Sequence, residues 1–131
     1  MKIPSENELD RIRREYPVGT IIELIEMSDK FAPPKGTLGE IEGVDDLGDI
    51  LVRWQTGSSL KVILSEDRIR KVNGAITICY GHREYWRSRK EAADHFFEGF
   101  CATEGSECKR YSKIYAELLC GKTVCSDEYE N

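Results

Sequence analysis

The sequence predicts an α+β protein: a short N-terminal helix and an SH3-like small β-barrel, followed by a β-hairpin and a C-terminal helical hairpin. The first observation behind this prediction is the alternation of apolar and polar residues in short segments of 1–72, the period of a pleated strand. The second is the spacing of apolar residues by three and four positions beyond residue 90, the period of a helix. Asn73-Gly74 separates the two patterns, so the expected domains are 1–72 and 73–131.

The N-terminal half begins with a helix and continues as strands. Ser5 and Glu8 form a capping box, which predicts a helix over about 5–15 that ends before Pro17. Short strands separated by glycine- and aspartate-rich turns favour a closed or half-closed barrel, with an open meander as the alternative. The strands are expected at about 20–27, 37–44, 50–55, 60–64 and 68–72.

The C-terminal half predicts a hairpin of strands, 75–80 with 84–87, and then two helices. A second capping box, Ser88–Glu91, opens the first helix, and the second begins near Ser106. Each helix carries an aromatic stripe, so the two are expected to pack antiparallel with these stripes facing. The acidic tail from Ser126 is expected to fray.

The charge balance favours a protein partner over nucleic acid. With 19 basic and 24 acidic residues, the net charge is −5, whereas broad DNA binders usually carry a basic surface. An acidic surface suits a basic partner. No apolar run is long enough to cross a bilayer and no secretory signal is visible, which predicts a cytoplasmic protein without a membrane partner. The candidate acidic contacts are Glu40, Glu42, Asp45, Asp46 and Asp49.

The cysteines and histidines give little sign of chemistry. Five cysteines without the two-residue spacing of zinc knuckles indicate reduced thiols, and we expect no metal and no cofactor. Cys79 near His82 could form a thiolate–imidazolium pair, but a packed cysteine is the commoner outcome in a hairpin. The acidic turn Asp45–Asp49 could attract a cation, although aspartates bonding their own backbone explain it better. No catalytic motif is present, so the chain is expected not to be an enzyme; a Cys/His enzyme or metal protein is the third-ranked hypothesis.

Two aromatic residues of the barrel half are candidate contacts. Phe31 lies beside Pro33-Pro34 on an expected loop, and SH3-type barrels bind extended peptides across aromatic grooves. Trp54 shares a strand face with Ile50 and Val52, so it can equally fill the barrel interior. The alternative function is a small nucleic-acid-binding module for single strands or RNA, in which aromatic rings stack on bases. Its phosphate contacts would be Arg53, Lys61, Arg68, Arg70 and Lys71.

Several motifs carry a family resemblance. The runs Ala32–Gly39 and Val44–Ile50, followed by Trp54 and Gly57–Leu60, resemble the domain of unknown function 4314 over roughly 14–72. The second half is similar to a tail found in small proteins of mobile elements in Gram-positive gut bacteria, through Tyr80-Gly81, Trp86, Ser88–Ala92 and Ala102–Glu107. This resemblance implies accessory cargo of conjugative elements or phages, and it carries no catalytic residues.

Together these observations predict a non-enzymatic, protein-binding accessory factor of a mobile genetic element. The expected role is inhibition of a host defence, as by an anti-CRISPR protein. The expected partner is a basic nucleic-acid-binding protein such as a CRISPR effector, because an acidic surface can occupy a groove that normally holds nucleic acid.

Overall fold

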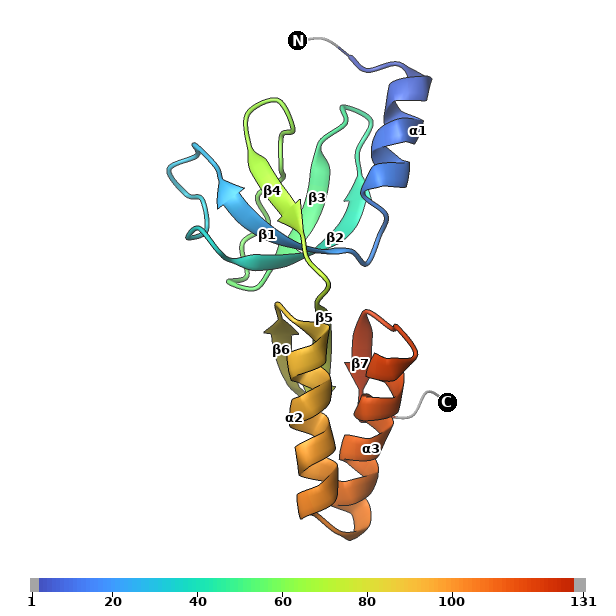
Figure 1. Cartoon of the computed structure of the whole chain (residues 1–131). Helices are drawn as coiled ribbons and strands as arrows, with labels where there is room; N and C mark the ends of the chain where they lie inside the picture. Colours follow the sequence, from blue (N-terminus) through green and yellow to red (C-terminus); the bar gives the residue numbers. More distant parts are fainter. Residues whose placement is uncertain (1–2, 129–131) are drawn as a thin grey trace. The chain divides into compact units, whose positions relative to one another are not determined.

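A computed structural model describes residues 3–128 and is α+β, with helices and two separate sheets (Figure 1). The chain forms two compact units, residues 1–72 and 73–131. We call them the N-terminal unit and the C-terminal unit and describe each by itself. None of the helices among residues 3–128 is long and apolar enough to cross a membrane.

The N-terminal unit opens with helix α1 (Glu6–Glu15). Its start is explained by the capping box, because the Ser5 hydroxyl accepts a hydrogen bond from the Glu8 amide at 3.2 Å. The helix buries Leu9 and exposes most of its charged residues. Its Arg13 guanidinium reaches the Val44 carbonyl at 3.1 Å, which ties the helix to the end of a strand.

The sheet of this unit contains four antiparallel strands in the order β3-β2-β1-β4. Their bounds are β1 Ile21–Glu26, β2 Leu38–Val44, β3 Ile50–Trp54 and β4 Arg68–Lys71. Register shifts interrupt β1 and β2, and such bulges bend a sheet. One face buries a continuous apolar core formed by Ile22, Leu24, Ile41, Ile50, Val52, Trp54 and Val62.

The strand expected at 60–64 does not form. Within residues 3–128, this segment contributes one isolated bridge, between Val62 and Ile50, and no continuous strand. The chain turns immediately after Val62, because the Ile63 amide bonds the Asp67 carboxylate at 2.8 Å instead of a neighbouring strand. The described sheet is therefore open, and no closed barrel forms in it.

Gly39 provides the first test of this packing. A Cβ atom at this position would lie 2.5 Å from Val52 Cγ1 and 2.8 Å from Trp54 Cε3. We expect Gly39→Ala to lower the free energy of unfolding by about 1–3 kcal/mol, because core residues must shift to admit the methyl group. Urea unfolding measures this change. Gly43→Ala is the control, since the nearest atom to its Cβ is Leu51 Cδ1 at 3.9 Å; equal midpoints for both variants would refute the packing.

The C-terminal unit combines a three-stranded sheet with two helices. Strands β5 (Ala75–Cys79) and β6 (His82–Trp86) form the expected hairpin, and helix α2 (Arg89–Ala102) begins at the second capping box. There the Ser88 hydroxyl accepts from the Glu91 amide at 3.2 Å. Helix α3 (Gly105–Leu119) packs against α2.

The aromatic stripes of these helices meet as the sequence predicts. Phe96 lies 5.8 Å from Tyr111, and Phe97 lies 5.4 Å from Tyr115, measured between ring centroids. Gly99 sits where an added Cβ would be 3.1 Å from the Tyr111 ring, so the glycine permits this close approach. The core of the unit comprises Ala75, Ala92, Phe96, Ile114, Leu118 and Cys125.

A third strand, β7 (Val124–Ser126), completes this sheet, although local sequence does not predict it. It pairs in parallel with β5, Val124 opposite Ile76 and Ser126 opposite Ile78. The expectation of an acidic tail that frays from Ser126 is corrected, because Ser126 and Asp127 are held in place and Asp127 is 4% exposed. The last part of that expected tail, 129–131, lies outside the described residues.

Candidate functional site

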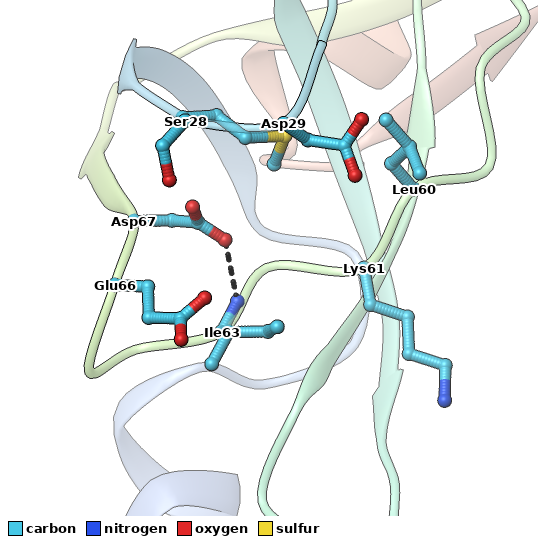
Figure 2. Close-up of a pocket in the computed structure, with 8 residues that line it drawn as sticks. Ser28, Asp29, Leu60, Lys61, Ile63, Glu66 and Asp67 are labelled. Atoms are coloured by element: carbon cyan, nitrogen blue, oxygen red, sulfur yellow. Dashed lines mark hydrogen bonds between the residues drawn. The ribbon is translucent and has the colours of Figure 1, made fainter. Parts of the chain in front are cut away.

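A recess of about 160 Å³ opens on the N-terminal unit (Figure 2). One side is formed by the residues just after β1, and the other by the segment that leads into β4. Three of the residues that line it are acidic, so the recess is suited to a positively charged group. The lining residues are Met27, Ser28, Asp29, Leu60, Lys61, Ile63, Glu66 and Asp67.

Local hydrogen bonds fix both walls of the recess. On one wall, the Asp29 carboxylate accepts the Phe31 amide at 2.7 Å, a turn in which aspartate bonds backbone two residues ahead. On the other, Asp67 Oδ2 accepts the Ile63 amide at 2.8 Å and closes the turn 63–67. Asp67 is 8% exposed, so its carboxylate lies at the base of the recess rather than on its rim.

The recess carries negative charge that its lysine leaves largely uncompensated. The Lys61 ammonium bonds the Asp45 carboxylate at 3.0 Å, and Figure 2 shows it directed away from Asp29, Glu66 and Asp67. This bond to Asp45 raises the pKa of Lys61, so the ammonium stays charged and committed to Asp45. Within residues 3–128, the Glu66 carboxylate has no hydrogen-bond or ion-pair partner.

Apolar side chains flank the recess. Ile63 lines the recess and is 38% exposed; its chain neighbour Leu64 is 36% exposed, and Phe31, two residues beyond Asp29, is 72% exposed. Several large exposed apolar side chains near one polar recess are typical of an interaction surface, whereas isolated exposed apolar residues are ordinary. The Lys30 ammonium lies 5.0 Å from the centroid of the Phe31 ring, as expected for a ring face that attracts cations.

The five acidic residues that the sequence singled out do not form one free patch. Glu42 pairs with Arg53 at 3.9 Å, and Asp46 pairs with Arg13 at 3.4 Å. Glu40 lies opposite Arg53 in the β2–β3 register. Positive side chains therefore already compensate much of this surface.

Asp45 serves the β2–β3 turn, as the backbone-bonding interpretation predicts. Its Oδ1 accepts the amides of Leu47 and Asp49, each at 3.0 Å. Burial opposes ionisation of Asp45, but Lys61 and these amides outweigh it and lower its pKa. Burial raises the pKa of Asp49, and the negative charges of Asp45 and Asp67 raise it further against the opposing effect of Lys61.

The two aromatic candidates, Phe31 and Trp54, differ in exposure. Phe31 is exposed, and its amide bonds Asp29 of the recess, whereas Trp54 is 1% exposed and belongs to the core. The Trp54 indole N–H donates to the Leu60 carbonyl at 2.9 Å, so its one polar atom is also satisfied internally. The proposal of Trp54 as a partner contact is therefore corrected: Trp54 fills the interior, the alternative that the sequence left open.

The basic candidates are spread over the unit, and most already face an acid or a ring. Arg70 pairs with the buried carboxylate of Glu23, Arg53 with Glu42, and Lys61 with Asp45. The Lys71 ammonium lies 4.9 Å from the Tyr16 ring centroid. Arg68 is exposed at the start of edge strand β4.

Cys79 and His82 face each other across the β5–β6 hairpin. Burial raises the pKa of the Cys79 thiol, and the negative charge of Asp127 raises it further, the opposite of what activates a nucleophile. In the described part of the chain, no group of three or more His, Cys, Asp or Glu residues could hold a metal ion.

The acids of the recess, Asp29, Glu66 and Asp67, are residues that sequence reasoning missed. The available signals were weak: Ser28-Asp29 comes just after the first strand, and Ser65-Glu66-Asp67 precedes the last. Strands β1 and β4 pair antiparallel, with Glu26 opposite Arg68. This pairing brings the end of β1 beside the start of β4, so the acidic residues that flank each strand meet there.

Comparison with known families agrees with the motifs of this half. Residues 5–72 match the model of the family described as Domain of unknown function (DUF4314). The search among curated proteins gave no match. The matched region contains α1, the whole four-stranded sheet and every residue that lines the recess. Since the match extends over half of the chain, the protein belongs to the DUF4314 family.

Proposed function

We propose that this protein is a non-enzymatic binding factor whose N-terminal unit docks a basic protein partner. The single observation that carries this proposal is the recess: a group of carboxylates without a cationic partner, lined also by exposed Ile63, with exposed Phe31 and Leu64 close by in the chain. Acidic charge selects a basic partner and speeds its encounter, while apolar anchors hold it.

The biological setting that we propose is an accessory role in a mobile genetic element, as an inhibitor of a host defence. The similarity of the C-terminal half to tails of mobile-element proteins supports this setting. The partner would be a basic nucleic-acid-binding protein such as a CRISPR effector, whose nucleic-acid groove complements an acidic surface.

We also propose that the N-terminal unit is a half-open SH3-like barrel. The strand order β3-β2-β1-β4 supports this, together with the isolated Val62–Ile50 bridge, which places residue 62 beside β3. In barrels of this type, extended peptides lie across the surface between loops, which fits a recess between the 27–37 loop and the 63–67 turn.

A nucleic-acid-binding module is the second candidate, favoured by the exposed basic residues of β4. Against it stand the acidic partners of Arg70, Arg53 and Lys61 and the negative charge of the recess. Binding of single-stranded nucleic acid would weaken steeply as salt increases. Capture of partners from a nuclease-treated lysate distinguishes the two candidates.

The test is a capture experiment with the tagged full-length chain in nuclease-treated bacterial lysate. We expect one stoichiometric protein partner, and we expect Glu66→Lys to reduce its capture at least tenfold. Glu66 is exposed and has no side-chain partner in the part of the chain described, so the fold should survive the change. Quantitative mass spectrometry of the eluate measures both results.

Glu98→Lys is the matched control, because it makes the same charge change on the exposed side of α2 in the other unit. It should capture the partner as well as the original chain does. Equal loss with both variants would mean that net charge matters and the recess does not. Recovery of nucleic acid, or of proteins that nuclease treatment removes, would instead favour the nucleic-acid module.

A further inference from the structure

The recess has the features of a socket for one cationic side chain. Asp67 is more than nine-tenths buried, and only its Oδ2 accepts a hydrogen bond, from Ile63 at 2.8 Å. Among residues 3–128, no group donates to Asp67 Oδ1, and Figure 2 shows this oxygen facing the space beside Ser28. Asp67 Oδ1 is not among the buried atoms without a partner, so it is accessible from the recess and can accept a hydrogen bond from a ligand that enters.

The spacing of the acids points to an organic cation rather than a metal ion. Asp29, Glu66 and Asp67 line the same recess, yet no three acidic, histidine or cysteine side chains in the described residues come close enough to hold one metal ion. A guanidinium is flat and offers five N–H donors in fixed directions, so it can bond carboxylates on both walls at once. An ammonium is a compact point charge and would reach fewer of them.

The flanking surface indicates what the cation is attached to. Ile63 lines one wall, and Phe31 follows the Asp29 wall by two residues; both side chains are exposed. An extended peptide places neighbouring side chains on alternate sides, so apolar residues near an inserted arginine can reach these side chains.

We infer that the recess binds an arginine side chain of an extended segment of the partner protein, with apolar residues of that segment packed on Phe31 and Ile63. This inference rests on the proposed protein-binding function and names the chemistry that its site recognises. Asp67 and Glu66 would bond the guanidinium, and Asp29 would contribute its charge from the opposite wall.

The test uses pools of fluorescent nine-residue peptides in which the central residue is fixed and the others are varied. One pool carries arginine and one carries citrulline, which has nearly the same shape without the charge. We expect the purified full-length chain to bind the arginine pool at least tenfold more tightly, measured by fluorescence anisotropy. A lysine pool should bind with intermediate affinity.

Two variants locate the effect. Glu66→Gln removes a charge from the rim, and Asp67→Asn keeps an acceptor for the Ile63 amide while replacing the other oxygen by a donor that opposes a guanidinium. Each should reduce the preference for arginine over citrulline to threefold or less. Glu98→Gln, on α2, should leave the preference unchanged.

Equal binding of the arginine and citrulline pools, or no binding of either, would overturn the inference. Arginine preference that persists in both recess variants would also overturn it, because the arginine would then bind elsewhere. If the capture experiment still gives a partner that depends on Glu66, the docking function stands and only the arginine socket fails. If the peptides behave as expected and no partner is captured, the socket stands and the proposed docking function fails.

Discussion

Replacing Trp54 by alanine is expected to lower the free energy of unfolding of the N-terminal unit by about 3–5 kcal/mol. Trp54 is among the largest fully buried side chains and contacts the core around Ile50 and Val52. Truncation leaves a cavity that the open sheet cannot fill, and the Leu60 carbonyl loses the indole donor that it bonds at 2.9 Å. Urea unfolding followed by far-ultraviolet circular dichroism measures this loss.

Phe31→Ala is the matched comparison, because it removes the other aromatic candidate. Phe31 is 72% exposed, so we expect stability to change by no more than about 0.5 kcal/mol. Partner capture should nevertheless fall. The two variants thus separate a core aromatic from a contact aromatic, and a stable Trp54→Ala variant with impaired binding would show the opposite assignment.

Replacing Asp127 by alanine is expected to destabilise the C-terminal unit by about 3 kcal/mol, the lower end of what breaking a buried ion pair costs, since Arg110 is partly exposed. Asp127 Oδ2 accepts the Tyr80 amide at 2.8 Å and bonds the Arg110 guanidinium at 2.7 Å. The same residue bonds the Ile78 carbonyl through its own amide at 3.0 Å. Asp127 therefore links the segment just after β7 to the β5–β6 turn and to α3.

The turn that Asp127 holds is itself strained. Tyr80 has a φ of 53°, the only positive φ at a non-glycine residue within the described chain. Such a conformation costs about 1 kcal/mol or more and persists only where surrounding contacts impose it. The Asp127 bond to the Tyr80 amide and the Arg110 guanidinium, 4.4 Å from the Tyr80 ring centroid, are the contacts that do so.

The effect of Asp127 should depend on pH in a definite direction. Burial opposes its ionisation, but the Tyr80 amide and Arg110 outweigh burial and lower its pKa below the ordinary value. A carboxyl whose pKa is lowered in the folded state stabilises the fold above its unfolded pKa, about 3.9, and loses this contribution as pH falls through the folded pKa. The difference between the original chain and Asp127→Ala should therefore be complete at pH 7 and shrink below about pH 4.

Urea titration followed by the Trp86 indole resonance measures this difference, because Trp86 belongs to the C-terminal unit and donates to Thr77 Oγ1 at 2.8 Å. Asp94→Asn is the control: its pair with Lys90 is exposed on α2, so its loss should leave the urea midpoint nearly unchanged. A pH-independent difference for Asp127→Ala would mean that the ion pair does not stabilise this unit.

Local sequence determined a large part of this fold. The serine half of each capping box forms as the sequence predicts, because the serine hydroxyl accepts from the amide three residues later at the start of the helix. The aromatic stripes of α2 and α3 meet because helical periodicity places residues three and four apart on one face. Strand β3 is explained by alternation of buried and less buried residues over five positions.

Non-local pairing decided the rest. The short strand β7 forms because Val124 pairs with Ile76 at the edge of β5 that β6 leaves open. Its three residues are too few to show a strand periodicity of their own. Alternation placed Trp54 on a strand face, but only the tertiary structure, which gathers the apolar core around it and brings the Leu60 carbonyl to its indole N–H, made it an interior residue. Similarly, segment 60–64 has strand periodicity, yet the Ile63 amide bonds the Asp67 carboxylate instead of the backbone of a neighbouring strand.

The candidate site shows the same division. The sequence by itself determined the acidic balance, the exposed loop with Phe31 and the absence of a recognised catalytic motif. Only the tertiary structure decided which acids remain uncompensated: those of the β2–β3 turn bond their own backbone or nearby cations, whereas Asp29, Glu66 and Asp67 share a recess. The physical reason is that a charge is neutralised by whatever the fold brings within a few ångströms, and the antiparallel pairing of β1 with β4 sets those neighbours across about forty residues of chain.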